Sequence, residues 1–291
     1  MTSKPADSSH FWGSWVKHVN FNNERMNKMK LSFSTIGCPD WSLEDILIAG
    51  SDLGYDGIEF RGIGKEVYTP ACPDFSDSKI SKTLDRLKEH HLQICCLTSG
   101  ACFYNENCQK EIMDYITLAN KLGVKYIRVL GDSQPHPSDL ANDKITHSIL
   151  EEMAPIATAK GITLCVETNG IYADTKRLAG ILKKYDGAVG ALWDINHPIR
   201  FFQETPEQTY DNIGPYLKHV HIKDSISLEG TIQYKLVGRG DLPIADVVKL
   251  LQTNGYDGFL SLEWIKRWNA QLEEPAMAFL YYVHEMKRLK A

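Results

Sequence analysis

The amino-acid sequence predicts an α/β fold in which eight parallel strands and their helices close into a single (β/α)₈ TIM barrel. Eight short apolar runs alternate with amphipathic segments, as expected when helices cover a parallel sheet. The 291 residues suffice for one such barrel, which typically needs roughly 250 residues. The chain contains neither GxGxxG after its first strand nor GxxxxGK[ST], which disfavours a nicotinamide enzyme and a P-loop NTPase.

The expected strands are short runs bounded by polar turns. They are LSFSTI (31–36), DGIEF (56–60), QICCLT (93–98), KYIRVL (125–130), ITLCVE (162–167), GALWD (190–194), KHVHIK (218–223) and FLSLEW (259–264). Residues 1–30 show no clear periodicity, and we interpret them as a poorly ordered N-terminal extension. The catalytic barrel is then expected to occupy residues 31–291.

Helices are expected between the strands, and several of these segments end in Gly, a helix C-terminal signal. The clearest are SLEDILIAGSDLG, SKTLDRLKEHH, EIMDYITLANKLG, PIADVVKLLQTNG and, as the last helix, EPAMAFLYYVHEMKRL.

Composition narrows the class of protein. The net charge of −5 leaves no basic stripe for a phosphate backbone, so nucleic acid is not expected as a partner. No apolar run reaches the length of a membrane span, about 18 residues. The seven cysteines are an odd number without paired CxxC spacing, which favours reduced thiols and a cytoplasmic location.

Four late strands end in side chains that can bind a metal ion: Glu167, Asp194, His221 and Glu263, separated by 27, 27 and 42 residues. The reactive groups of such barrels lie where strands end, and the first two intervals suit one βα unit each. Capping and surface pairing are the alternative for any single residue. The phasing of all four favours one shared site.

Strand parity supports a common direction for these residues. Side chains alternate faces along a strand, so Glu167 shares a face with Cys165, His221 with Lys223, and Glu263 with Ser261. The polar faces can point into the barrel while aliphatic faces pack under helices. Three carboxylates and one imidazole suit one Mn²⁺, Mg²⁺ or Co²⁺ ion, with Zn²⁺ as an alternative.

At these residues the chain resembles the xylose-isomerase-like TIM-barrel superfamily of sugar phosphate isomerases and epimerases, over essentially residues 31–291. The resemblance rests on an ordered series of short motifs. They are DLGYDGIEFRG (52–62), VETNG (166–170), WDINH (193–197), HVHIKD (219–224), VGRGDLP (237–243) and SLEW (261–264).

The resemblance to ketose 3-epimerases implies that the four residues bind one metal and that His197 contacts substrate. Two further family positions depart: an Arg six residues past the metal His is Ser227, and a second substrate Glu is Ala173. Both departures argue against ketohexose 3-epimerase activity itself. Lys223, two residues past the metal His, resembles the branch that includes inosose dehydratases and becomes a candidate for substrate binding or acid–base work.

The expected activity is isomerisation or epimerisation of a small sugar, keto-polyol or sugar phosphate through an enediolate. Glu167 and Glu263 would exchange the proton next to the carbonyl, with Lys223 as a further catalytic group. Barrels of this kind often assemble, which is compatible with a homo-oligomer.

Further substrate-binding candidates come from other strand ends. Glu59 and Arg128 are expected to bind substrate hydroxyls, or each other as a buried ion pair that supports the barrel. Trp264 and Trp268 are candidates for walls of the pocket, with ordinary packing as the alternative. Arg239, between Gly238 and Gly240, is a candidate for anion binding, with a tight turn as the alternative; His219 is expected to support the site rather than bind metal.

Three other functions stay open. The nearest is a metal-dependent lyase that dehydrates an inosose-like keto-polyol. An endonuclease IV-like enzyme is disfavoured because the early strands end without His and the chain is acidic. A barrel that senses a sugar or metal without turnover is the non-enzymatic alternative.

Overall fold

The computed structural model describes residues 29–185 and 187–290. The expected extension, residues 1–30, lies almost wholly outside the described residues and stays a prediction. The first strand begins at Lys30, and Met29 before it is already buried.

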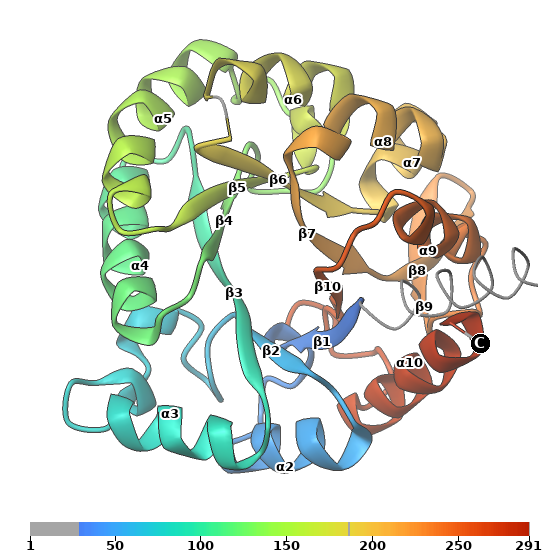
Figure 1. Cartoon of the computed structure of the whole chain (residues 1–291). Helices are drawn as coiled ribbons and strands as arrows, with labels where there is room; N and C mark the ends of the chain where they lie inside the picture. The colour runs from blue at the N-terminus through green and yellow to red at the C-terminus, as the bar shows by residue number, and fades with distance from the viewer. Residues whose placement is uncertain (1–28, 186, 291) are drawn as a thin grey trace, which may run out of the picture.

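Eight strands close into a parallel barrel at the centre of the molecule (Figure 1). They are β1 (Lys30–Ser34), β2 (Gly57–Phe60), β3 (Gln93–Cys102), β4 (Tyr126–Leu130), β5 (Thr163–Glu167), β6 (Val189–Asp194), β7 (Leu217–Ile222) and β10 (Phe259–Leu262). Their order around the barrel is β1-β10-β7-β6-β5-β4-β3-β2, and each neighbouring pair is parallel. The predicted single (β/α)₈ barrel is confirmed, and each expected run overlaps one of these strands.

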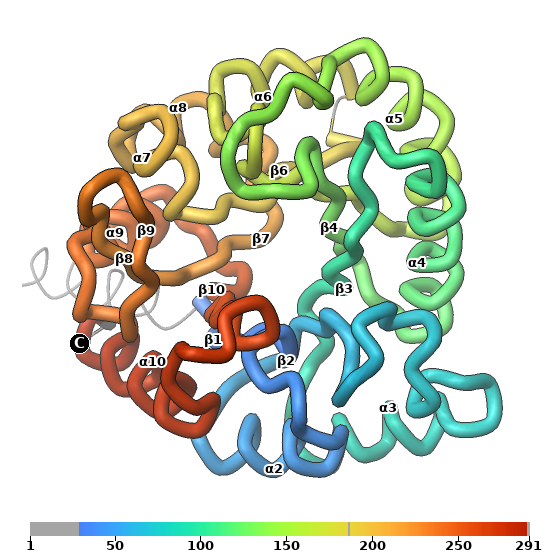
Figure 2. Tube along the Cα trace, turned by 180° about the vertical axis from the view of Figure 1, so that it is seen from behind, coloured from blue at the N-terminus to red at the C-terminus, as the bar shows by residue number. Residues whose placement is uncertain are grey.

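Helices form the outer layer that covers the barrel, as both views show (Figures 1 and 2). In the described residues they are α2 (Leu43–Leu53), α3 (Ile80–Glu89), α4 (Cys108–Leu122), α5 (Asp143–Thr158), α6 (Thr175–Leu182), α7 (Asn196–Phe202), α8 (Pro206–Ile213), α9 (Ile244–Thr253) and α10 (Pro275–Lys290). None of them has the length and hydropathy that crossing a membrane requires.

Local sequence signals set several helix ends. Ser42 and Asp45 form a capping box at the start of α2, which satisfies backbone N–H groups of the first turn. Gly54 and Gly123 end α2 and α4 in the left-handed conformation, with φ of 78° and 68°. A residue without Cβ adopts that conformation at little cost, which explains why Gly precedes the following strands.

A two-stranded antiparallel hairpin, β8 (Asp224–Leu228) and β9 (Thr231–Lys235), follows β7 and stands outside the barrel. None of the strands expected from the sequence lies here. In the view from behind, the hairpin and the loop before α10 lie on the same side of the barrel mouth (Figure 2).

The carboxylate of Asp224 anchors this hairpin to the glycine-rich loop that follows it. Its Oδ2 accepts hydrogen bonds from the backbone N–H groups of Gly238 at 2.9 Å and Gly240 at 2.8 Å. The loop VGRGDLP, a candidate for binding a substrate anion, therefore holds a carboxylate of the chain itself. Converging backbone N–H groups stabilise an anion, and here that anion is the carboxylate of Asp224.

We expect Gly240→Ala to destabilise the protein by about 1–3 kcal/mol, because overpacking of a filled site forces backbone shifts. A Cβ at this position would lie 2.1 Å from Asp224 Oδ1 and 2.4 Å from the Ser225 carbonyl oxygen. Urea unfolding measures the change. Gly180→Ala in α6 is the matched control, because its Cβ would meet nothing within 4 Å. Equal stability of Gly240→Ala and the wild type would contradict this account of the anchor.

Candidate metal centre

The structure brings together the four residues predicted as metal ligands. Glu167 and Asp194 end β5 and β6, His221 is the penultimate residue of β7, and Glu263 directly follows β10. One potential ligand atom from each lies within 4.8 Å of the others. All four side chains are buried. Their convergence makes the quartet a candidate site for one ion.

Strand register explains this convergence. Asp194 is paired with His221 across β6 and β7, and Ser261 with the same His221 across β10 and β7. Glu263, two residues after Ser261, therefore points to the same inward face. Glu167 is paired across β5 and β6 with Leu192, which shares a face with Asp194. The predicted parity thus describes the interior of the barrel mouth correctly.

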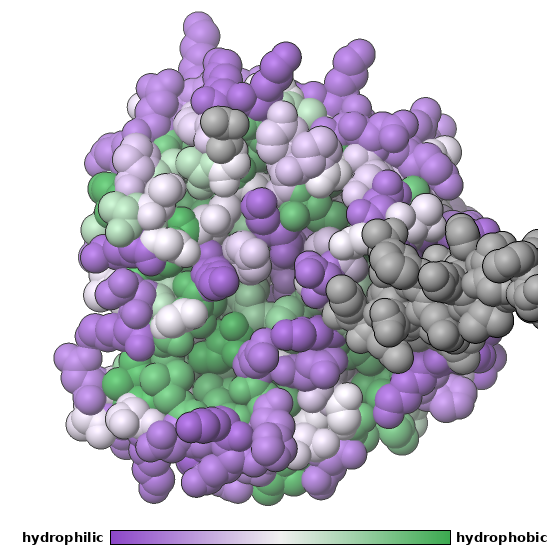
Figure 3. All heavy atoms as spheres, in the orientation of Figure 1, coloured by the Kyte–Doolittle hydropathy of each residue, from purple (hydrophilic) through white to green (hydrophobic). Residues whose placement is uncertain are grey.

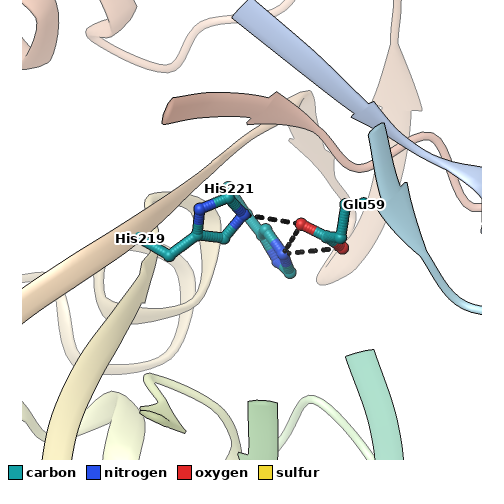
Figure 4. Close-up of side chains that lie close together, drawn as sticks. All are labelled: Glu59, His219 and His221. Carbon is teal, nitrogen blue, oxygen red and sulfur yellow. Dashed lines mark hydrogen bonds and ion pairs between the residues drawn. The ribbon is translucent and has the colours of Figure 1, made fainter. Parts of the chain in front are cut away.

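His221 presents its two ring nitrogens to different neighbours. Nε2 lies 3.1 Å and 3.0 Å from the two carboxylate oxygens of Glu59 (Figure 4). An ionised carboxylate only accepts, so Nε2 carries the proton and donates it to Glu59. Nδ1 faces the quartet, 3.5 Å from Glu263 Oε1, and is buried without a hydrogen-bond partner in the part of the chain that the structure describes.

Glu59 lies beneath the quartet and organises the buried histidines. His219 Nε2 donates to its Oε2 at 2.7 Å, and Thr98 Oγ1 donates to its Oε1 at 2.7 Å. Burial opposes its negative charge, but the charges and hydrogen bonds of His221 and His219 hold the pKa of Glu59 well below its usual range. Glu59 was expected to bind substrate or Arg128. Its oxygens instead accept hydrogen bonds from His219 and His221. Glu59 on β2 points into the barrel toward β7 and does not line the cavity.

Two buried cations separate the carboxylates of the quartet. Arg128 Nη1 lies 2.8 Å from Glu167 Oε2 and 3.5 Å from Glu263 Oε1. Lys223 Nζ lies 2.6 Å from Asp194 Oδ2 and also contacts Glu263 Oε2. Arg128 was predicted as a substrate residue or a partner of Glu59. The structure pairs it with two of the predicted ligands rather than with Glu59 and also places it on the cavity wall, so its contact with substrate stays a prediction.

The electrostatics of the site follow from these contacts. Burial alone would raise the pKa of Glu263, but the positive charges of Lys223, His221 and Arg128 outweigh it and hold the pKa below its usual range. Burial would lower the pKa of Lys223, but Asp194 and Glu263 outweigh it and raise the pKa above its usual range. Without a metal ion, Glu59 and Glu263 overcome burial and raise the pKa of His221 to about 9.

The residues present fit a divalent metal ion. The buried Nδ1 of His221 is directed toward three carboxylates and has no hydrogen-bond partner among the described residues. A divalent ion would displace the proton that the raised pKa keeps on the ring and bind the lone pair of Nδ1. A carboxylate that accepts the other ring N–H fixes the tautomer and increases the basicity of the ligating nitrogen, as in known metal sites. Oxygen-rich sites with one imidazole suit Mn²⁺, Mg²⁺, Co²⁺ or Zn²⁺. Glu59, His219 and His221 also lie close enough to share an ion, but their hydrogen bonds already satisfy one another.

A cavity of about 600 Å³ opens onto the quartet. This volume is within the range of small-molecule sites, roughly 300–1,000 Å³. Glu167 and Glu263 form part of its wall together with residues of several loops. The other residues that line it include Arg61, Arg128, His197, Lys223, Tyr234 and Trp268.

The remaining predicted substrate residues divide into two groups. His197, at the start of α7, lines the cavity, and its Nδ1 lies 3.1 Å from the Thr168 carbonyl oxygen. Because a carbonyl only accepts, Nδ1 carries the proton and Nε2 is left as an acceptor. Trp264 is 2% exposed and its Nε1 donates to the Glu273 carbonyl, so it packs inside while Trp268 forms the wall.

Arg239 lies away from the cavity. Its Nε donates to the Tyr281 hydroxyl at 2.5 Å, on α10. The two positions that depart from the epimerase pattern do not line the cavity either. Ser227 is exposed on β8, and Ala173 is fully buried in a short 3₁₀ helix.

Sequence reasoning missed Arg61 and Tyr234 as cavity residues. Arg61 shares the inward face of strand 2 with Glu59, and this parity was the available signal. Tyr234 reaches the cavity from β9, with Lys223 Nζ 5.8 Å from the centre of its ring. The hairpin was not among the strands expected from the sequence, so the alternation of its side chains could not indicate Tyr234.

A larger cavity of about 820 Å³ lies at the opposite end of the barrel, next to Lys30, Gln93 and Tyr126, where strands begin. Apolar residues gather on one face of the molecule inside a polar rim (Figure 3). The smaller cavity is the better candidate for catalysis, because barrel enzymes carry their reactive groups at the carboxyl ends of strands and the quartet opens into it.

Comparisons with known proteins agree with this architecture. Fructoselysine 3-epimerase of Escherichia coli O157:H7 is 23% identical over 283 residues, which cover 90% of this chain and 98% of that one. The probable 3-DHS dehydratase AsbF of Bacillus anthracis is 18% identical, with a TM-score of 0.68 over 90% of this chain and 99% of that chain.

A solved structure of the IOLI protein holds a zinc atom, and it matches with 18% identity and a TM-score of 0.66 over 89% of this chain and 96% of that chain. At this identity the solved structures show the fold alone. The model of the xylose isomerase-like TIM barrel family matches residues 47–283, most of the sequence. This chain therefore belongs to the xylose isomerase-like TIM barrel family.

Proposed function

We propose that this protein is a divalent-metal-dependent epimerase or isomerase of a small sugar, keto-polyol or sugar phosphate. One observation carries the proposal: Glu167 and Glu263 line a cavity of about 600 Å³ and belong to a quartet in which His221 Nδ1 faces the carboxylates and has no hydrogen-bond partner in residues 29–185 and 187–290. Glu167, Asp194, His221 and Glu263 would hold the ion. A divalent ion at this place polarises a carbonyl and makes the adjacent C–H group more acidic.

Two carboxylates suit removal and return of a proton on opposite faces of one carbon. Glu167 and Glu263 come from β5 and β10, which are separated by β6 and β7 in the barrel, so they approach the cavity from different sides. The positive charges of Lys223 and Arg128 favour the ionised form of Glu263, which can accept a proton. One residue would take the proton next to the carbonyl, and the other would deliver a proton to the opposite face.

His197 and Lys223 would orient the substrate. The Nε2 of His197 can accept from a substrate hydroxyl because Nδ1 donates to Thr168. The ammonium of Lys223 can stabilise negative charge on a substrate oxygen, and its ion pairs with Asp194 and Glu263 hold it at the edge of the quartet. These positions fit reactions in which charge develops on oxygen.

The test is proton exchange in D₂O on the Mn²⁺-loaded protein with a panel of ketoses and keto-inositols, followed by NMR. Exchange at the carbon next to the carbonyl, without loss of water, supports epimerisation or isomerisation. Metal binding without exchange on any member would instead favour a sensor.

A second candidate is a lyase that dehydrates an inosose-like keto-polyol. Lys223 favours it, because a buried ammonium at the cavity wall can protonate a departing hydroxyl. Accumulation of an enone or diketone in the same experiment supports this candidate. One relative above is named as an epimerase and the other as a probable dehydratase, so their names favour neither reaction over the other.

Lys223→Met separates the two candidates. If Lys223 protonates a leaving hydroxyl, its loss should lower dehydration by about 10²–10⁴-fold while exchange persists. If it only stabilises charge on oxygen, exchange and any dehydration should fall together. Lys249→Met, on the exposed face of α9, is the control and should change neither rate.

We also propose a cytoplasmic location. All seven cysteines are buried and free, which fits a reducing compartment.

A further inference from the structure

Arg61 lies across the barrel mouth from the quartet. It follows β2 directly, and its backbone N–H donates to the Thr35 hydroxyl, just past β1, at 2.8 Å. Its Nη2 comes within 2.7 Å of where a Cβ on Gly100 of β3 would stand. The quartet is carried by β5, β6, β7 and β10, on the other side of the closed sheet. Arg61 and the quartet line the same cavity from opposite sides, so a ligand held at the quartet can extend toward Arg61.

The positive charge of Arg61 is not neutralised by a close carboxylate. The cavity wall carries three permanent cations, and Arg128 and Lys223 are each paired with carboxylates of the quartet. Arg61 has no carboxylate within 4.0 Å among residues 29–185 and 187–290. The nearby Glu111 attracts it from farther away, but its Oε1 already accepts the Gly100 N–H at 2.7 Å.

The guanidinium is held in place but not satisfied. Nη1 donates to the Val67 carbonyl at 2.7 Å, and Nε is buried without a hydrogen-bond partner in the described part of the chain. Burying a charged donor without a partner is costly, so such groups usually serve a ligand. Burial lowers the pKa of Arg61, and the positive charge of Arg128 adds to this effect.

We propose that Arg61 binds an oxyanion at the end of the substrate that lies away from the quartet. This inference rests on the proposed function and narrows its substrate class to keto-sugars or keto-polyols that carry a carboxylate or a phosphate. A guanidinium recognises either group through two parallel N–H donors. Ile36, Leu130 and Ile265 in the same wall reduce competition from water.

The experiment compares three ketoses that share one carbonyl end and differ only at the last carbon: D-fructose, D-fructuronate and D-fructose 6-phosphate. Dissociation constants are measured by calorimetry on the full, Mn²⁺-loaded chain. We expect at least one charged member to bind on the order of tenfold more tightly than D-fructose, the usual effect of a charged hydrogen bond. The charged ketose that binds more tightly shows whether the site prefers a carboxylate or a phosphate.

Arg61→Gln should bring the ratio of the neutral and charged dissociation constants close to one. Arg61→Lys keeps the positive charge but loses the two parallel N–H donors, so it should retain part of the preference for the charged ketoses. It also serves as the test if Arg61→Gln does not fold. Arg239→Gln removes the same charge outside the cavity and should keep the wild-type ratio. A wild-type ratio near one, or a ratio unchanged in both Arg61 variants, would overturn the proposal.

Proton exchange in D₂O, measured in parallel, separates the two proposals. A charge preference that depends on Arg61, without exchange on any ligand, supports the anion site and contradicts the proposed reaction. Exchange on D-fructose without a preference for the charged ketoses supports the proposed reaction and contradicts the anion site.

Discussion

Glu167→Gln should reduce proton exchange on the substrate by about 10²–10⁴-fold, the usual contribution of a positioned acid–base group. The amide cannot accept the proton at neutral pH, although its oxygen can still face the ion. It also weakens the ion pair with Arg128, whose Nη1 lies 2.8 Å from Glu167 Oε2. NMR in D₂O measures the exchange, and metal analysis of the same sample shows how much ion is retained.

The matched control is Glu89→Gln, which makes the same chemical change on the exposed end of α3. It should exchange at the wild-type rate. If Glu167→Gln retained both its metal and full exchange, Glu167 would not be the proton acceptor and the proposed reaction would need another base.

Glu59→Gln should weaken metal binding by about 10- to 100-fold, the usual effect of removing the partner of a ligating histidine. The neutral amide no longer holds the protons of His219 and His221, whose Nε2 atoms lie 2.7–3.1 Å from the Glu59 oxygens. The His221 tautomer that directs a lone pair at the quartet then loses its support. We also expect a loss of about 1–3 kcal/mol in the free energy of unfolding, because buried donors lose a charged acceptor.

Thr98→Val provides the comparison for Glu59→Gln. It removes only the hydrogen bond from Thr98 Oγ1 to Glu59 Oε1 and keeps the contacts between Glu59 and the histidines. Calorimetric titration with Mn²⁺ should therefore show a smaller loss of affinity than in Glu59→Gln. Wild-type affinity in Glu59→Gln would show that Glu59 does not support the ligand.

Much of the fold could be read from the sequence because each strand carries its own signal. Apolar runs such as ITLCVE are continuous, and glycines such as Gly54 and Gly123 end the helices between them. The quartet could be predicted for the same reason: parity and the position at a strand end are local properties. Its convergence then follows from closure of the barrel.

Contacts across the barrel could not be predicted in this way. Glu59 and His221 are 162 residues apart in the sequence and meet only when strands 2 and 7 face each other in the interior. Arg239 was expected to bind an anion because barrels often bind phosphate after strand 7. Asp224 instead accepts the hydrogen bonds of the backbone N–H groups in that loop, and Arg239 contacts Tyr281. Trp264 follows the last strand closely and is buried there, while Trp268 is 60% exposed and reaches the cavity wall.

The central claim is that one divalent ion binds between four strand ends, and a crystal structure of the Mn²⁺-loaded protein tests it most directly. Anomalous scattering locates the ion. We predict one ion within about 2.0–2.6 Å of oxygens of Glu167, Asp194 and Glu263 and of Nδ1 of His221. An ion bound instead between Glu59, His219 and Nε2 of His221, or one that leaves the quartet without contact, would contradict the account.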